Sequence, residues 1–333
     1  MEEQNIEKLK HVEQINEETD EEAEEVHEEE LAVDREGEED ILSEYPDDSE
    51  EIELIHARLT AIPNLERFKH LKRICFRQNL ITTVNSLDSL TNLEEIDFYD
   101  NRISYVEGFE KLENLQYLDL SFNKIRKIEN IEMLTKLVQV FFVSNKISRI
   151  ENLNTLQNIT NLELGANRIR RIEGLEALVN LEQLWLGKNK ITQLENLSPL
   201  RNLKLLSIQS NRLTKIEGLE ELESLEEIYL SHNGIEKLEG FEKNLKLRVI
   251  DIANNRVTRV ENISHLPHLE EFWANNNQLE SFEEVERELG QAKKLTTIYL
   301  EGNPLQTRNM AQYRLKVKLA LPQVLQIDAT YVR

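Results

Sequence analysis

The chain has 333 residues, one cysteine and a net charge of −23. One cysteine excludes an intramolecular disulfide and any zinc site built from several cysteines. No run of about 18 apolar residues occurs, and the opening MEEQNIEKLK lacks the apolar core of a secretory signal, so we expect neither a membrane span nor a cleaved leader.

The acidity is concentrated at the start of the chain. Residues 1–50 hold 23 acidic and three basic side chains, which leaves the remainder nearly neutral. A segment with so few apolar residues and so much charge cannot bury enough surface to offset its ordering entropy. We therefore expect residues 1–40 to form a disordered acidic tail, which either solubilises the protein or attracts a basic partner.

An internal repeat follows the acidic segment. From Asn79 to Asn277 an asparagine recurs every 22 residues within the pattern LxxLxLxxNxL, and Asn303 follows after a step of 26. A degenerate unit with Ala57 at the asparagine position precedes them. The pattern is typical of leucine-rich repeats, in which each unit adds one short strand to a parallel sheet. We predict an α/β solenoid of about 11–12 such units over residues 41–302, with a continuous parallel sheet on its concave face.

Two recurring positions predict local structure within each coil. The asparagine is expected to point inward, where its amide can satisfy backbone groups of adjacent coils. Glu followed by Gly or Asn also recurs with the same period, as at Gly108 and Asn130. These are the residues that most readily adopt positive φ, so a tight turn is expected there.

Both ends of a solenoid expose core and must be capped. Residues 303–333 are predicted to form the C-terminal cap, with a helix from Asn309 to about Leu321 that Pro322 ends. The apolar segment VLQIDA would then close the last turn. The N-terminal cap is predicted within residues 41–56.

One position in each strand lies between two core residues and should face the concave surface. In this column an aromatic recurs every second repeat from Phe141 through Trp185 and Tyr229 to Trp273, about 10 Å apart, and acidic or small residues fill the gaps. Both tryptophans fall in this column although only 6% of the chain is aromatic. Trp and Tyr are enriched at binding hot spots. We expect the column to be displayed to solvent and to bind a partner surface rich in Lys or Arg, although scattered exposed aromatics without a role stay an alternative.

No catalytic constellation is found. The seven histidines are scattered, and neither a P-loop nor a GxGxxG motif occurs. One carboxylate per coil is a poor cage for calcium, and an acidic surface repels nucleic acid. We expect a protein without enzymatic activity, cofactor or metal, which binds neither nucleic acid nor membrane.

The NxIxxIE[GN] units and the ending NPLQ…YRLKVKLALPQVLQIDAT resemble the leucine-rich-repeat regulatory subunits of protein phosphatase 1, over about residues 41–333. The resemblance implies a non-enzymatic protein that binds the phosphatase catalytic subunit through its concave face and controls its activity or assembly. It also implies a place in nucleus and cytoplasm, a role in the cell cycle and chromosome segregation, and room for a third regulatory protein. The implied contact residues are Asp119, Phe141, Glu163, Trp185, Tyr229, Asp251, Glu271, Trp273 and Tyr299.

Other interpretations stay open. The stretch RICF, residues 73–76, matches a short segment through which many phosphatase 1 partners dock, but Ile74 and Phe76 occupy predicted core positions, so we expect it not to be used. The repeats could instead form a generic scaffold of cilia or centrosomes that binds another protein. The acidic segment 1–48 could instead bind histones or act as a chaperone.

Overall fold

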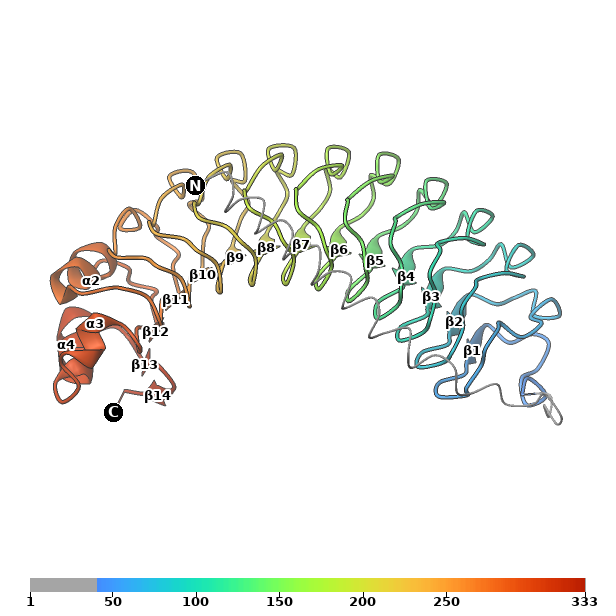
Figure 1. The fold of residues 1–333 in the computed structure, drawn as a ribbon, viewed down its shortest axis with the longest axis horizontal. Helices are drawn as coiled ribbons and strands as arrows, with labels where there is room; N and C mark the ends of the chain where they lie inside the picture. The colour runs from blue at the N-terminus through green and yellow to red at the C-terminus, as the bar shows by residue number, and fades with distance from the viewer. Residues whose placement is uncertain (1–40, 333) are drawn as a thin grey trace, which may run out of the picture. The chain divides into compact units, whose positions relative to one another are not determined.

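The computed structural model describes residues 41–332. The chain divides into two units, with the boundary between Pro46 and Asp47. The predicted acidic tail, residues 1–40, lies outside the described residues. Within the second unit the chain winds into a curved solenoid, with its strands on the inner side and its turns on the outer side (Figure 1).

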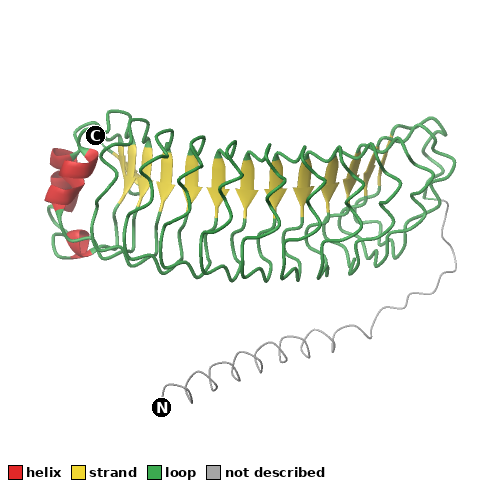
Figure 2. Ribbon diagram, turned by 90° about the horizontal axis from the view of Figure 1, so that it is seen from above, coloured by secondary structure: helices red, strands yellow, loops and turns green. Residues whose placement is uncertain are grey.

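Each coil contributes one strand of three residues, and the strands lie side by side in one sheet (Figure 2). β1 to β12 pair in parallel and in chain order. The register advances by 22 residues a coil from β1 to β11, as in Ile74↔Ile96 and Ile96↔Leu118, and by 26 from β11 to β12. The strands are β1 (Glu51–Glu53), β2 (Arg73–Cys75), β3 (Glu95–Asp97), β4 (Tyr117–Asp119), β5 (Gln139–Phe141), β6 (Asn161–Glu163), β7 (Gln183–Trp185), β8 (Leu205–Ser207), β9 (Glu227–Tyr229), β10 (Val249–Asp251), β11 (Glu271–Trp273) and β12 (Thr297–Tyr299).

The core lies between the sheet and the outer turns. The middle residue of each strand points into it and is fully buried, as Ile96, Leu118 and Leu184 show. Because side chains alternate along a strand, the first and third residues of each strand share the opposite, concave face. The predicted parallel-sheet solenoid of 22-residue repeats is confirmed.

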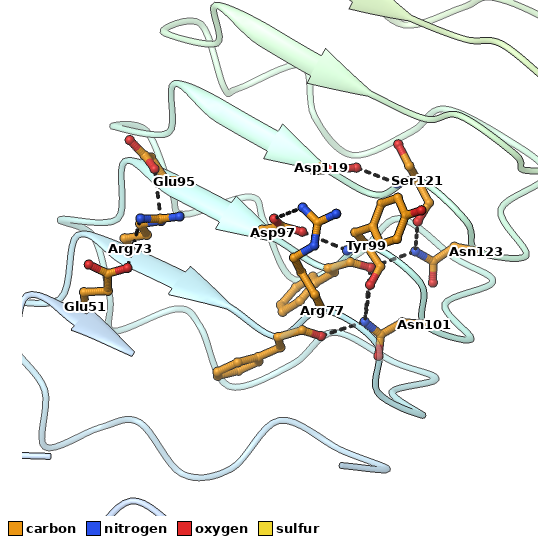
Figure 3. Close-up of polar contacts among 12 residues, drawn as sticks. Glu51, Arg73, Arg77, Glu95, Asp97, Tyr99, Asn101, Asp119, Ser121 and Asn123 are labelled. Atoms are coloured by element: carbon orange, nitrogen blue, oxygen red, sulfur yellow. Dashed lines mark hydrogen bonds and ion pairs between the residues drawn. The ribbon is translucent and has the colours of Figure 1, made fainter. Parts of the chain in front are cut away.

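The repeated asparagine joins adjacent coils, as predicted. Asn123 Nδ2 donates to the carbonyl of Phe98 in the preceding coil at 3.0 Å and to that of Leu120 at 3.1 Å. Its Oδ1 accepts from the Ile103 amide at 2.9 Å. The close-up includes Asn123 and its neighbour Asn101 (Figure 3). The asparagines therefore form a ladder inside the solenoid that satisfies buried backbone groups.

The predicted tight turns are present. The recurring Gly or Asn has positive φ throughout, for example +69° at Gly174 and +62° at Asn152. A Cβ on Gly174 would stand 2.5 Å from the Ile150 carbonyl oxygen of the coil before. Asn152 instead donates its Nδ2 to the Ile128 carbonyl at 2.7 Å. Both Gly and Asn suit this position, because Gly leaves room for the neighbouring carbonyl and Asn bonds to it.

The 26-residue step before the last repeat holds a helix that we did not predict, α2 (Phe282–Leu289). Ser281 caps it by accepting the Glu284 amide on its side chain. At the other end of the helix, Glu288 Oε2 accepts the amides of Ile263 and Ser264 at 3.3 and 3.2 Å. The helix is thus fastened to the coil that precedes it.

The C-terminal segment contains α3 (Pro304–Thr307), α4 (Tyr313–Ala320), β13 (Gln326–Ile327) and the antiparallel β14 (Thr330–Tyr331). The predicted helix was too long at its start, because the residues after Asn309 form turns and α4 begins only at Tyr313. Within the described part of the chain, no helix has the length and apolar character needed to cross a membrane.

Candidate partner-binding surface

The fold brings the nine predicted contact residues onto one face of the sheet. Eight are the third residues of their strands, and Glu271 is the first residue of β11, which shares that face. They extend from Asp119 in β4 to Tyr299 in β12. Adjacent strands lie about 4.8 Å apart, so neighbouring members of this column contact one another.

The expectation that the whole column is displayed to solvent is wrong for its shorter members. Asp119 and Asp251 are only 6% exposed, and Ser207 is 1% exposed. Trp185 and Trp273 are half-buried rather than projecting. The reason is the close strand spacing, since a short side chain lies below the level of its larger neighbours.

Three aromatic rings gather at the C-terminal part of the column. The centroid of the Trp273 ring lies 6.2 Å from that of Tyr229 and 5.9 Å from that of Tyr299, both edge-on. The Tyr229 and Trp273 rings thus approach across the short Asp251 instead of standing two strands apart. Edge-on packing fixes the rings and presents a continuous half-buried apolar surface.

Glutamates at the first strand position bind the polar ends of two of these rings. The Trp273 indole donates its Nε1–H to Glu271 at 3.0 Å. The Tyr229 hydroxyl donates to Glu227 at 2.8 Å, and burial, followed by this hydrogen bond, raises the pKa of that hydroxyl. The rings of Trp273 and Tyr229 are therefore each oriented by a carboxylate of their own strand, whereas the Tyr299 hydroxyl accepts Gln326 Nε2 at 2.8 Å.

The centre of the concave face holds polar groups without partners. Among the described residues, the buried indole Nε1 of Trp185 and the buried Oδ1 of Asn161 have no hydrogen-bond partner. Asn161 Nδ2 makes one long bond of 3.5 Å to Glu163. A partner that supplied an acceptor to Trp185 and a donor to Asn161 would remove two buried unsatisfied groups, each of which costs about 1–3 kcal/mol.

The column also holds carboxylates away from water. Burial raises the pKa of Asp119, Glu163 and Asp251. Asp119 Oδ1 accepts the amide of Ser121 at 2.8 Å, which partly offsets the effect of burial. Burial disfavours the charged form of these carboxyl groups. A cation placed against them would therefore stabilise that charged form.

Of the first residues of the strands, only Glu271 was among the predicted contact residues. The first residue of β4, Tyr117, packs its ring 5.2 Å from that of Phe141. Asn161 and Glu227 are likewise the first residues of their strands and bond to third-position residues. The two-residue period of a strand was the available signal, because it places first and third residues on one face. The candidate surface is therefore two residues wide on each strand.

The RICF stretch forms β2 and the residue after it. Ile74 and Phe76 are fully buried, and Cys75 is 2% exposed. Docking through this segment would require the coil to unfold. Among the described residues, no group of three or more His, Cys, Asp or Glu side chains could hold a metal ion.

Comparison with known proteins agrees with the architecture. The model of the family described as "Leucine-rich repeat" matches residues 116–221 and 208–333, and a second model, of paired leucine-rich repeats, matches residues 91–133. The chain therefore belongs to the leucine-rich-repeat family.

Among its relatives are regulatory subunits of protein phosphatase 1. The chain is 62% identical over 45 residues to "Protein phosphatase 1 regulatory subunit SDS22" of Schizosaccharomyces pombe, and 65% identical over 46 residues to "Protein phosphatase 1 regulatory subunit 7" of Mus musculus. Each match covers 14% of this chain, and it covers 14% of the yeast protein and 12% of the mouse protein.

Two solved structures share the fold. An internalin from Listeria monocytogenes has a TM-score of 0.66 at 20% identity, covering 85% of this chain and 87% of that one. A leucine-rich-repeat protein of Leptospira interrogans has a TM-score of 0.65 at 25% identity, covering 79% of this chain and 74% of that one.

Proposed function

We propose that this protein is a non-enzymatic regulatory subunit of protein phosphatase 1, which grips the catalytic subunit with its concave face and controls its activity or assembly. The observation that carries the proposal is the column from Asp119 to Tyr299, where half-buried aromatic rings stand among acidic and small side chains on one face of the sheet. The names of the relatives supply the identity of the partner.

The arrangement suits a basic, partly apolar partner surface. The rings of Tyr229, Trp273 and Tyr299 are already fixed against one another, so binding orders few side chains and loses little entropy. Asp119 and Asp251 would gain cationic partners on binding. The unpaired polar atoms of Trp185 and Asn161 would gain hydrogen bonds.

Calorimetric titration with the purified phosphatase catalytic subunit tests the proposal. We expect the variant Trp185→Ala/Trp273→Ala to bind at least about 30-fold more weakly than the wild type, equivalent to about 2 kcal/mol at a hot spot. Met133→Ala is the matched control, because Met133 is 60% exposed in the turns between β4 and β5. Circular dichroism would establish that each variant is folded.

The outcomes separate the candidate functions. If the wild type binds no phosphatase, the proposal is wrong and the generic scaffold becomes the better hypothesis. If only removal of residues 1–40 abolishes binding, the acidic segment is the docking site. We further propose that the protein acts in nucleus and cytoplasm, which imaging of the tagged chain would examine.

A further inference from the structure

A second surface lies along the side of the sheet formed by the carboxyl ends of its strands, just after β3 and β4. It consists of Tyr99, Asp100 and Phe122, which we call the edge patch. Phe122 comes three residues after Asp119, so the edge patch adjoins the concave column.

Phe122 is an unusual residue for its position. The residue before each repeat asparagine has positive φ, and Phe122 has φ +55°. The other occupants of this position are polar or small, as Ser144 in the next coil is. A bulky side chain in this region is strained by about 1–3 kcal/mol. Phe122 is nevertheless 43% exposed, so core packing does not explain it.

The ring of Phe122 packs against Tyr99, whose own ring is contacted by Arg77. The centroids of the Phe122 and Tyr99 rings are 4.8 Å apart. The Arg77 guanidinium carbon also lies 4.1 Å from the centroid of the Tyr99 ring. Arg77 is itself fixed by an ion pair of 2.8 Å with Asp97 (Figure 3). Tyr99 is the one aromatic ring that Phe122 contacts within residues 41–332, which leaves the outer part of Phe122 open.

An acidic residue lies beside the open ring in the preceding coil. Asp100 occupies the same position one coil earlier and is exposed. Its carboxylate makes no hydrogen bond or ion pair with any residue that the structure describes. An aromatic face beside a free carboxylate matches the two preferences of a guanidinium, which stacks on rings and pairs with carboxylates.

The protein contains a filled example of this arrangement. Arg77 stacks on Tyr99 and pairs with Asp97, two residues before that ring. We propose that the edge patch takes an arginine side chain of the phosphatase catalytic subunit, which stacks on Phe122 and pairs with Asp100. This inference rests on the proposed function, and it adds a contact beyond the concave column.

Titration of full-length variants with the purified catalytic subunit tests the contact. Phe122→Ser installs the residue of the next coil and relieves the strain, so we expect it to fold normally and to bind about 5-fold to 30-fold more weakly. Asp100→Asn is expected to bind about 3-fold more weakly, with a smaller dependence on salt. Tyr105→Ser is the matched control, since Tyr105 is an aromatic residue that is 66% exposed in the turns between β3 and β4.

Phe122→Leu identifies the chemistry of the occupant. Leucine keeps apolar bulk but offers no ring face, so an arginine partner predicts that Phe122→Leu binds as weakly as Phe122→Ser. If Phe122→Leu binds with wild-type affinity, the occupant is an apolar side chain and not an arginine, and the inference is overturned. Unchanged affinity for Phe122→Ser, or an equal loss for Tyr105→Ser, would also overturn it while the proposed function stands. No binding by the wild type would refute both.

Discussion

The asparagine ladder allows a stability effect to be worked out from individual hydrogen bonds. Asn145 is 8% exposed, and its Nδ2 donates to the carbonyls of Leu120, Phe142 and Val143 at 2.9, 3.2 and 3.3 Å. Its Oδ1 accepts the Ile125 amide at 2.9 Å. We consider the substitution Asn145→Ala, which removes all four contacts in the middle of the solenoid.

The three carbonyls keep other donors after this substitution. Leu120 still accepts from Asn123 at 3.1 Å, and Phe142 still accepts from Asn167 at 2.8 Å. Val143 still accepts the backbone amide of Phe122 at 2.7 Å. Only the Ile125 amide loses its sole acceptor, and an orphaned buried donor costs about 1–3 kcal/mol.

We therefore expect Asn145→Ala to lower the free energy of unfolding by about 2 kcal/mol. Urea denaturation followed by circular dichroism would measure it. The control is Asn158→Ala, because Asn158 makes one exposed bond of 2.9 Å to the Thr135 carbonyl, which water can replace. We expect that control to cost less than about 1 kcal/mol. Equal costs for the two variants would refute the argument that an orphaned amide dominates.

Three further predictions concern other parts of the molecule. Gly174→Ala should lower the free energy of unfolding by about 1–3 kcal/mol through positive φ and the clash with the preceding carbonyl, whereas Gly165→Ala, which lacks positive φ, should cost less in the same urea experiment. Tyr313→Phe should cost about 1.5–3 kcal/mol by urea denaturation, because the buried hydroxyl donates to the Asp328 carboxylate at 2.9 Å; an unchanged midpoint would contradict this. Burial raises the pKa of Asp251, so the folded state binds that proton more tightly than the unfolded state, and the carboxyl lowers stability as pH rises through the interval between the two pKa values. Asp251→Asn should therefore raise Tm at neutral pH, and its advantage should vanish in acid below both pKa values; a constant advantage in a series of melts would contradict the burial argument.

The fold was predictable because many positions impose the same period. A strand, an inward asparagine and a positive-φ turn recur every 22 residues, and each is consistent with the others. The helix α2 was missed because it interrupts that period, although Ser281 and Glu284 have the spacing of a capping box. A capping box is a signal of four residues, whereas the repeat around it extends over many coils.

The candidate surface was predicted by position but not by depth. Alternation along a strand showed which residues share the concave face, and the structure places all nine there. It could not show that Asp251 lies beneath rings that meet above it, because the contact between Tyr229 and Trp273 depends on rotamers across three coils. The edge patch was missed because the strain at Phe122 is a backbone property.

The buried aspartates show why this surface is better suited to binding than to stability. Asp97, Asp119 and Asp251 each accept the amide two residues later, at 3.0, 2.8 and 2.9 Å. Asp97 also has a cation inside the chain, since Arg77 pairs with its second oxygen.

Asp119 and Asp251 have no ion pair with any residue that the structure describes, and burial raises the pKa of both carboxyls. Retaining two such groups lowers the stability of the free protein at neutral pH. A basic partner would give Asp119 and Asp251 the cationic neighbour that Arg77 gives Asp97. Part of the binding free energy would then come from removing the unfavourable burial of these two carboxylates in the unbound solenoid.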